Sequence, residues 1–312
     1  MEWYFWLCIA IALIIGAVFA IARWTYSMAF YSPKNRKEDI YDIPVGEQYQ
    51  EERAFMCKLI KEMSEVPFEW VETTSYDGLK LRARYYHVRD GAPLQIQCHG
   101  YRGTAYRDFC GGNKLAREYG HNTLVIDQRA HGKSEGTSIS FGIREKHDCT
   151  SWIRYALERF GKDTELYLSG VSMGAATVLM CCGLDLPKNV KAVIADSPFS
   201  SPREIIQKVC KDMGYPPKLA MPFLRLGARL FGKFTLDGSA TEAVKNARVP
   251  ILIIHGEADR FVPCEMSKAI YNANPEKITL ATFPEAGHGL SYIKDNARYA
   301  ETVRTFLEGV HA

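Results

Sequence analysis

Hydrophobic residues are unevenly distributed along the chain, and the longest apolar run stands at its beginning. Residues Trp3 to Ala22 contain no charged side chain and have no polar face. Twenty residues of helix, at ~1.5 Å each, span ~30 Å, the thickness of the hydrocarbon core of a bilayer. Aromatic residues mark both ends of the run, as at membrane–water interfaces; they are Trp3, Tyr4, Trp6, Trp24 and Tyr26. We therefore expect residues 1–24 to form a transmembrane anchor.

The flanks of this run favour an anchor over a cleaved signal peptide. Glu2 precedes the run without any lysine or arginine, and the run is longer than the apolar core of a signal peptide. Four basic residues follow it, namely Arg23, Lys34, Arg36 and Lys37. The positive-inside rule then places the rest of the chain in the cytoplasm, although Glu38 and Asp39 reduce the charge asymmetry. A buried helix of a soluble domain is the alternative.

Residues 25–67 form a connecting region between the anchor and the remaining chain. Its middle is polar and contains Pro33 and Pro44. Residues 51–63 then place apolar side chains at helical spacing, which predicts a short helix. We expect this helix to pack on the domain that follows.

From residue 68 onward, short apolar runs alternate with helical patterns. Strands are predicted at 71–75 and 79–87, on either side of the turn Asp77-Gly78, and at 94–98, 123–127, 165–169, 190–196, 249–255 and 278–283. Helices are predicted at 107–119, 144–160, 173–183, 263–273 and 296–309. Continuous apolar strands that alternate with helices predict an α/β domain over 68–312, with a mostly parallel central sheet and helices on both faces.

The interval between Asp196 and Val249 is too long for a single crossover helix. Two helical patterns, at 202–213 and 217–232, lie within it, and Ser239 to Glu242 form a capping box for a further helix. We expect about 198–236 to be a small helical cap over the active site. An ordinary peripheral insertion is the alternative.

Composition narrows the classes of function. The chain has 39 basic and 36 acidic residues, which leaves no basic excess for binding nucleic acid. Its nine cysteines show no zinc-ligand spacing, and we interpret them as reduced, mostly buried thiols, with disulfide pairing as the alternative. No phosphate-binding glycine pattern follows a strand, so nucleotide chemistry has no support.

Candidate catalytic residues follow the predicted strands, where the active site of a parallel sheet lies. Ser172 is the centre of Gly170-Val171-Ser172-Met173-Gly174, a G-x-S-x-G sequence between a strand and a helix. His288 follows the last strand and is the candidate base, because a serine hydroxyl needs one. Asp259 follows the preceding strand and is the candidate acid; Glu257 and Asp196 are its rivals.

Two backbone amides are expected to stabilise an oxyanion. Met173 supplies one as the residue after the nucleophile, and Tyr101 supplies the other from the loop His99 to Gly103. His99 is expected to orient this loop. Residues that follow strands or begin helices near the site are candidates for lining a substrate pocket; they are Arg102, Tyr106, Phe199 and Phe261.

Four sequences carry a resemblance to a known family: HGYRG at 99–103, DQRAHGKSEG at 127–136, GVSMG at 170–174, and HGEADRFVP at 255–263 with AGHG at 286–289. In this order they resemble the α/β-hydrolase superfamily, close to esterase, lipase and peptidase-like members with an N-terminal membrane anchor. The resemblance implies neither a metal nor an organic cofactor. It also implies that Asp127 and His131 shape the site without belonging to the triad.

Together these features predict a membrane-anchored serine hydrolase that cleaves a carboxylic ester of a small acyl substrate through an acyl-enzyme. A peptidase, thioesterase or lipase on the same triad is the alternative within enzymes, since one fold hosts many reactions. A non-catalytic, membrane-tethered binding protein is the alternative outside them.

Overall fold

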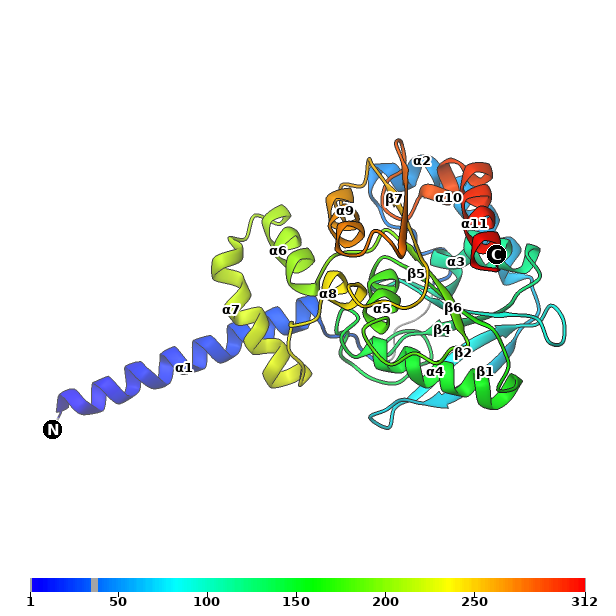
Figure 1. Cartoon of the computed structure of the whole chain (residues 1–312). Coiled ribbons are helices and arrows are strands. Elements are labelled where there is room, and N and C mark those ends of the chain that lie inside the picture. Colours follow the sequence, from blue (N-terminus) through cyan, green and yellow to red (C-terminus); the bar gives the residue numbers. More distant parts are fainter. Residues whose placement is uncertain (1, 35–38, 312) are drawn as a thin grey trace.

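A computed structural model describes residues 2–34 and 39–311 of the 312-residue chain. Its body is one sheet covered by helices, and a long N-terminal helix, α1 (Glu2–Ala29), projects from it (Figure 1). The expected polar flank of α1 includes Arg36 and Lys37, which lie outside the described residues.

The sheet has eight strands in the order β1-β2-β4-β3-β5-β6-β7-β8. Their bounds are β1 Glu69–Thr74, β2 Lys80–Tyr86, β3 Leu94–Cys98, β4 Asn122–Asp127, β5 Leu166–Val171, β6 Val190–Asp196, β7 Ile251–Gly256 and β8 Ile278–Phe283. β2 pairs antiparallel with β1 and β4, and every other pairing is parallel. Every residue of β3, β4 and β7 is buried, as expected of strands that helices cover on both faces. The predicted fold class is confirmed.

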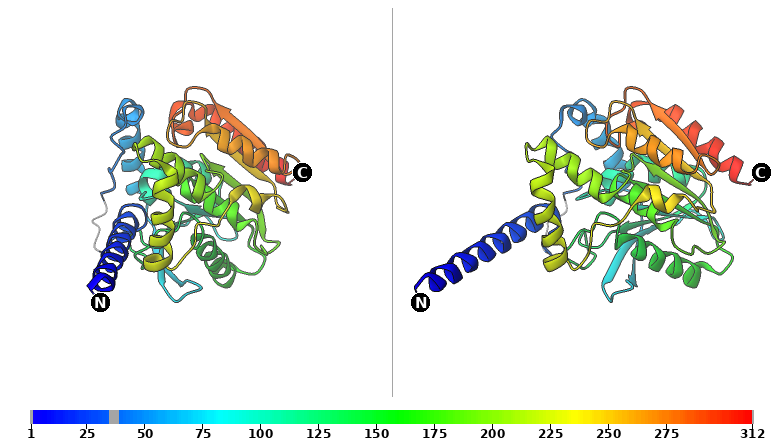
Figure 2. Two further views of the ribbon diagram at one scale, coloured as in Figure 1. Left: turned by 90° about the vertical axis from the view of Figure 1, so that its left-hand side faces the viewer. Right: turned by 60° about the vertical axis from the view of Figure 1, so that its left-hand side comes forward.

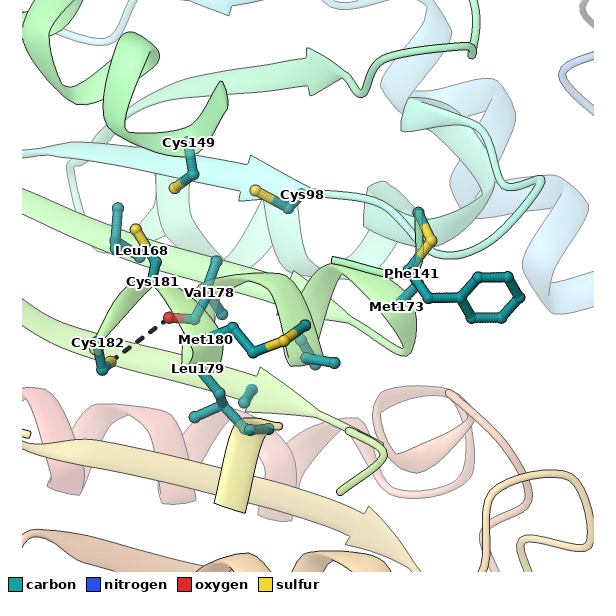
Figure 3. Packing of buried hydrophobic residues seen from close by; sticks show 14 of the residues in the cluster. Cys98, Phe141, Cys149, Leu168, Met173, Val178, Leu179, Met180, Cys181 and Cys182 are labelled. Carbon is teal, nitrogen blue, oxygen red and sulfur yellow. Dashed lines mark hydrogen bonds between the residues drawn. The ribbon is translucent and has the colours of Figure 1, made fainter. Parts of the chain in front are cut away.

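Helices cover both faces of this sheet. One face carries α2 (Glu47–Ser64), α3 (Ala105–Glu118), α10 (Ser291–Lys294) and α11 (Asn296–His311), and the other carries α4 (Glu145–Phe160), α5 (Met173–Cys181), α8 (Ala240–Val244) and α9 (Cys264–Ala273). Figure 3 shows part of the hydrophobic core on the face covered by α4 and α5, where Cys98, Cys149 and Cys181 lie close to Leu168 and Val178. All nine cysteines are free thiols, and seven of them are buried.

Helix α1 has two unlike parts. Only 6% of its most apolar stretch is buried against the rest of the protein. The helix is long and apolar enough to cross a membrane, as an anchor or a signal sequence would be. Its last turns instead enter the body, where Ala22 and Tyr26 are buried, as is Phe30 just beyond the helix. The Tyr26 hydroxyl lies 2.6 Å from Ser138 Oγ. Tyr26 is therefore a core residue, and its predicted place in an interfacial belt is wrong, because the helix continues past the apolar run.

The segment predicted as a cap contains α6 (Pro202–Asp212), α7 (Pro217–Gly227) and a turn of π-helix, η1 (Ala228–Gly232). Ser201 caps α6 by accepting a hydrogen bond from Glu204 N, and Ser239 caps α8 through Glu242 N, as the capping box predicts. α7 and η1 pack along the inner part of α1 (Figures 1 and 2). This contact joins the N-terminus of the chain to its middle.

Candidate active site

Ser172 stands on a strained turn between β5 and α5. Its backbone has φ 55° and ψ −114°, in a region that non-glycine residues rarely adopt. A Cβ on Gly170 would overlap the backbone of Gly174, and a Cβ on Gly174 would overlap the carbonyl of Cys98. Both flanking positions of the G-x-S-x-G sequence therefore require glycine for steric reasons.

The structure brings Ser172, His288 and Asp259 together. His288 Nε2 lies 2.9 Å from Ser172 Oγ, and His288 Nδ1 lies 2.7 Å from Asp259 Oδ2. The three residues follow β5, β8 and β7, so the carboxyl ends of three parallel strands present them at one edge of the sheet. Each is less than one-tenth exposed. This arrangement has the nucleophile–base–acid geometry of a hydrolytic triad.

Asp259 is held as a carboxylate. Its Oδ1 accepts hydrogen bonds from Phe261 N and Val262 N, each at 2.8 Å. Burial alone would raise the pKa of Asp259, but the imidazoles of His288 and His255 more than offset it and hold this pKa below its ordinary value. An ionised Asp259 keeps Nδ1 of His288 protonated, which leaves Nε2 to accept a proton from Ser172.

The two rival acids have other hydrogen-bond partners. Asp196 is buried, its Oδ1 accepts a hydrogen bond from Ser197 Oγ at 2.9 Å, and burial raises its pKa. Glu257 accepts a hydrogen bond from Thr282 Oγ1 at 2.6 Å. Of the three acids, Asp259 is the one that meets His288 Nδ1.

The loop after β3 lies directly against the nucleophile. A Cβ built on Gly100 would be 3.3 Å from Ser172 Cβ, and Gly100 N donates to Asp108 Oδ2 at 2.7 Å. His131 Nε2 accepts a hydrogen bond from Arg102 N at 3.0 Å, which holds Arg102 at φ 50°. These contacts place the loop that carries Tyr101 next to Ser172, while Met173 opens α5 directly after it. Their roles as oxyanion donors stay a prediction.

His99 is a buried, neutral support of this loop. Burial lowers the pKa of His99 to about 4. Its Nδ1 donates to Gly100 O at 2.8 Å, and its Nε2 accepts from Gln128 N at 3.1 Å, so both ring nitrogens are engaged by the backbone. The position agrees with the expected orienting role of His99.

A cavity of about 550 Å³ opens at Ser172. One part of its lining, here called the catalytic wall after the candidate residues Ser172 and His288, also includes Gly100, Tyr101 and Phe261. A second part, here called the N-terminal wall, is the segment Asp42 to Tyr49. The inner part is mainly apolar and includes Met56, Phe109, Val171, Tyr292 and Ile293. An apolar cavity with a few polar groups beside a nucleophile is the usual form of a small-molecule site.

Two of the four predicted pocket residues line this cavity, namely Arg102 and Phe261. The other two lie outside it. Tyr106 is buried under the Arg84 guanidinium, 4.8 Å from its ring centroid, and Phe199 is 1% exposed and packs beside Phe141. Both point into the core, because α3 and the loop after β6 turn these side chains away from the site.

The predicted cap does not cover the cavity. Among the described residues that line it, none comes from 198–236. Helix α6 touches only its rim, where Lys208 Nζ binds the carbonyl of Arg260 and lies 5.7 Å from the Phe261 ring centroid. Residues 42–49 of the connecting region, between α1 and α2, line the cavity instead.

Sequence reasoning missed two residues of the N-terminal wall. The Tyr49 hydroxyl donates to the backbone carbonyl of His288 at 2.9 Å, and burial raises the pKa of Tyr49, so it remains a neutral donor. The side chain of Gln48 occupies the space that a Cβ of Gly287 would need. No motif surrounds these residues, and their segment has the composition of a linker.

Within the described ranges, no group of three or more histidine, cysteine, aspartate or glutamate side chains is placed to hold a metal ion.

Comparisons with known proteins agree with this architecture. Residues 96–229 match the family described as alpha/beta hydrolase fold. The uncharacterized protein YqkD of Bacillus subtilis is 24% identical over 307 residues, covering 97% of each chain. The zebrafish (Danio rerio) lysophosphatidylserine lipase ABHD12 is 24% identical, over 70% of this chain and 59% of its own.

Among solved structures, the esterase Pf2001 of Pyrococcus furiosus superposes with a TM-score of 0.66 at 22% identity, covering 80% of this chain and 92% of the esterase. At this identity the likeness concerns the fold. Sheet order, the position of the site and the family match lead to one conclusion: the chain has the α/β hydrolase fold, and its residues 96–229 match the family of that name.

Proposed function

We propose that this protein is a serine hydrolase that cleaves carboxylic esters through an acyl-enzyme. The observation that carries the proposal is the unbroken chain of contacts from Ser172 Oγ through His288 to Asp259. It is supported by the strained backbone of Ser172, which is typical of a nucleophile elbow.

The reaction would proceed in two halves. Ser172 Oγ attacks the acyl carbonyl while His288 Nε2 takes its proton, and the amides of Met173 and Tyr101 stabilise the oxyanion. The tetrahedral intermediate collapses, the carbon–oxygen bond to the alcohol breaks, and His288 gives its proton to the leaving alcohol. His288 then removes a proton from water, the resulting nucleophile attacks the acyl-enzyme, and Ser172 is released with its proton restored.

The cavity favours an apolar acyl group. Its inner part is formed largely by Met56, Phe109, Val171 and Ile293, which offer few hydrogen-bond partners to a peptide. The relatives support an ester too, because one is a lysophosphatidylserine lipase and a structural neighbour is an esterase. A peptidase or a thioesterase would use the same triad on a different substrate.

We further propose that α1 anchors the protein in a membrane, with the catalytic domain on the cytoplasmic side, as Arg23 and Lys34 favour. The buried positions of Ala22, Tyr26 and Phe30 support an anchor over a cleaved signal sequence. Cleavage at the end of the helix would remove the side chains of Ala22 and Tyr26 from the core.

Labelling with a fluorophosphonate probe tests the catalytic proposal. The full chain in detergent should be labelled, and the Ser172→Ala variant should not be, with both showing the same circular dichroism. A p-nitrophenyl ester series of increasing acyl length would then define the substrate. Folded wild type that resists the probe and hydrolyses no ester of the series would contradict the proposal and favour a binding protein.

A further inference from the structure

The body exposes an unusual number of large apolar side chains on the segment around α7. Outside α1, eight large hydrophobic residues are strongly exposed in the described chain, and four of them lie between residues 213 and 230. They are Met213, Tyr215, Leu219 and Leu230, with exposures of 52%, 44%, 68% and 47%. We call these four residues, together with the basic residues that lie between them in the sequence, the α7 platform. Apolar side chains gathered in this way mark an interaction surface.

This platform lies directly beside α1, at the level where its apolar run ends. The rings of Phe231 and Phe19 are 5.1 Å apart, and those of Tyr215 and Trp24 are 6.3 Å apart. A Cβ on Gly227 would come within 2.5 Å of the Ala22 carbonyl, so the two helices touch through backbone. Both views of Figure 2 show α7 against the inner part of α1. If α1 crosses a bilayer, the α7 platform lies at the level of the lipid headgroups.

The charge of the same segment fits a lipid surface. Residues 202–233 contain seven lysines and arginines and two acids, whereas the whole chain is nearly balanced at 39 and 36. The basic residues are Arg203, Lys208, Lys211, Lys218, Arg225, Arg229 and Lys233. Exposed apolar side chains mixed with an excess of basic ones are typical of helices that lie in the interface of an anionic membrane.

We propose that the α7 platform is a second membrane contact, which inserts its apolar side chains into the interfacial layer of an anionic bilayer beside α1. The proposal rests on the proposed role of α1 as a membrane anchor. Together with α1, this second contact would hold one face of the domain at the bilayer surface. Through α6, whose Lys208 binds Arg260 O beside Phe261, the platform also ties the rim of the cavity to the lipid surface.

Depth-dependent fluorescence quenching tests this contact in the full chain. Cys8→Ser and Cys57→Ser remove the two thiols that are not buried, and single cysteines are then introduced for a bimane fluorophore. Leu219→Cys reports the platform and Ile14→Cys reports α1. Val88→Cys is the matched control, an exposed apolar residue whose amide binds Asn122 at the amino end of β4, away from the cavity.

The labelled proteins are reconstituted in nanodiscs of phosphatidylglycerol and phosphatidylcholine with brominated acyl chains. Bromines should quench the fluorophores at positions 14 and 219 at least twofold more than the one at 88. Fluorophosphonate labelling equal to that of wild type shows that each variant is folded.

The contribution of the basic residues to membrane contact is tested on the Leu219→Cys protein. Lys218→Gln, Arg225→Gln and Arg229→Gln together should reduce its quenching by about half in anionic discs. The matched control is Lys162→Gln, Lys188→Gln and Arg248→Gln, which removes three exposed basic residues that precede β5, β6 and β7 and should change nothing.

Equal quenching at positions 219 and 88, with strong quenching at 14, would overturn the platform and leave the anchor intact. Absence of quenching at 14 would overturn the anchor, and the platform with it. A blue-shifted but unquenched fluorophore at 219 would mean that a protein surface, such as a second copy of the chain, covers these residues, and would also overturn the proposal.

Discussion

The catalytic wall and the N-terminal wall of the cavity were built in opposite ways. Ser172, Asp259 and His288 each stand just after a parallel strand, inside a short sequence that specifies its own turn. The N-terminal wall, residues 42–49, contains no such sequence and arrives from a distant part of the chain. The walls meet where the Tyr49 hydroxyl binds the His288 carbonyl. Local sequence therefore carries the residues of the proposed chemistry, while packing between distant segments encloses them.

A second link joins the N-terminal segment to the catalytic wall. The Tyr101 hydroxyl donates to Ala29 O at 2.9 Å, and Arg102 Nη2 donates to Met28 O at 2.9 Å and Tyr31 O at 3.3 Å. The last carbonyls of a helix lack partners within it, and here the loop beside Ser172 supplies them. The end of α1 therefore braces the proposed oxyanion loop. This difference between the walls leads to four predictions.

The largest effect is expected on the catalytic wall. Asp259→Asn should lower kcat roughly 10³–10⁴-fold with little change in fold, because the amide no longer holds His288 in the required tautomer. Ester hydrolysis at saturating substrate measures it. Asp196→Asn is the matched control and should retain activity within about tenfold. A reversed ranking would assign the acid to Asp196.

The next largest effect separates the two parts of α1. Deletion of residues 2–20 should leave the unfolding temperature in detergent nearly unchanged, because that part contacts the body little. Deletion of residues 2–30 removes Ala22, Tyr26 and Phe30 from the core and should lower the unfolding temperature by roughly 10 °C or more. Equal unfolding temperatures would show that the inner part of α1 adds nothing to stability.

A pH effect is expected at His99, which supports the catalytic wall. Its folded pKa of about 4 lies below the ordinary value, so between about pH 6.5 and 4 the unfolded chain binds a proton that the folded chain does not. The free energy of unfolding should therefore fall as pH falls, by about 2 kcal/mol from this group between pH 7 and pH 5. Denaturant unfolding at both pH values measures it. His99→Gln should remove this part of the dependence, and an unchanged dependence would argue against a buried, neutral His99.

The smallest effect is expected at the N-terminal wall. Tyr49→Phe removes one hydroxyl and its hydrogen bond to His288 O, worth about 0.5–1.5 kcal/mol, so kcat/KM should fall roughly 3–10-fold. Steady-state hydrolysis of a p-nitrophenyl ester measures the change. Tyr41→Phe, just before this wall and outside the cavity lining among described residues, should have no effect. Equal activity of both variants would mean that the wall does not position His288.

Much of the fold could be read from the chain itself. β3, β6 and β8 begin and end at the predicted residues. β6 shows why, because its run from Ala192 to Ala195 is apolar and buried, as expected of a parallel strand covered on both faces. The positions of Ser172, Asp259 and His288 were likewise predictable, since each depends on a turn of a few residues after a strand. Glycines such as Gly170 and Gly174 show why, because the turn leaves no space for a side chain.

Tertiary structure alone decided what surrounds the site. Tyr26 and Trp24 are two residues apart and equally aromatic, yet one is buried in the body and the other is half exposed. Phe199 and Phe261 both follow strands, yet the first lies in the core and the second on the cavity. Local pattern shows that a side chain is apolar and which element carries it. Which surface covers it depends on contacts between segments far apart in the chain, as when residues 42–49, rather than α6 and α7, close the cavity over Ser172.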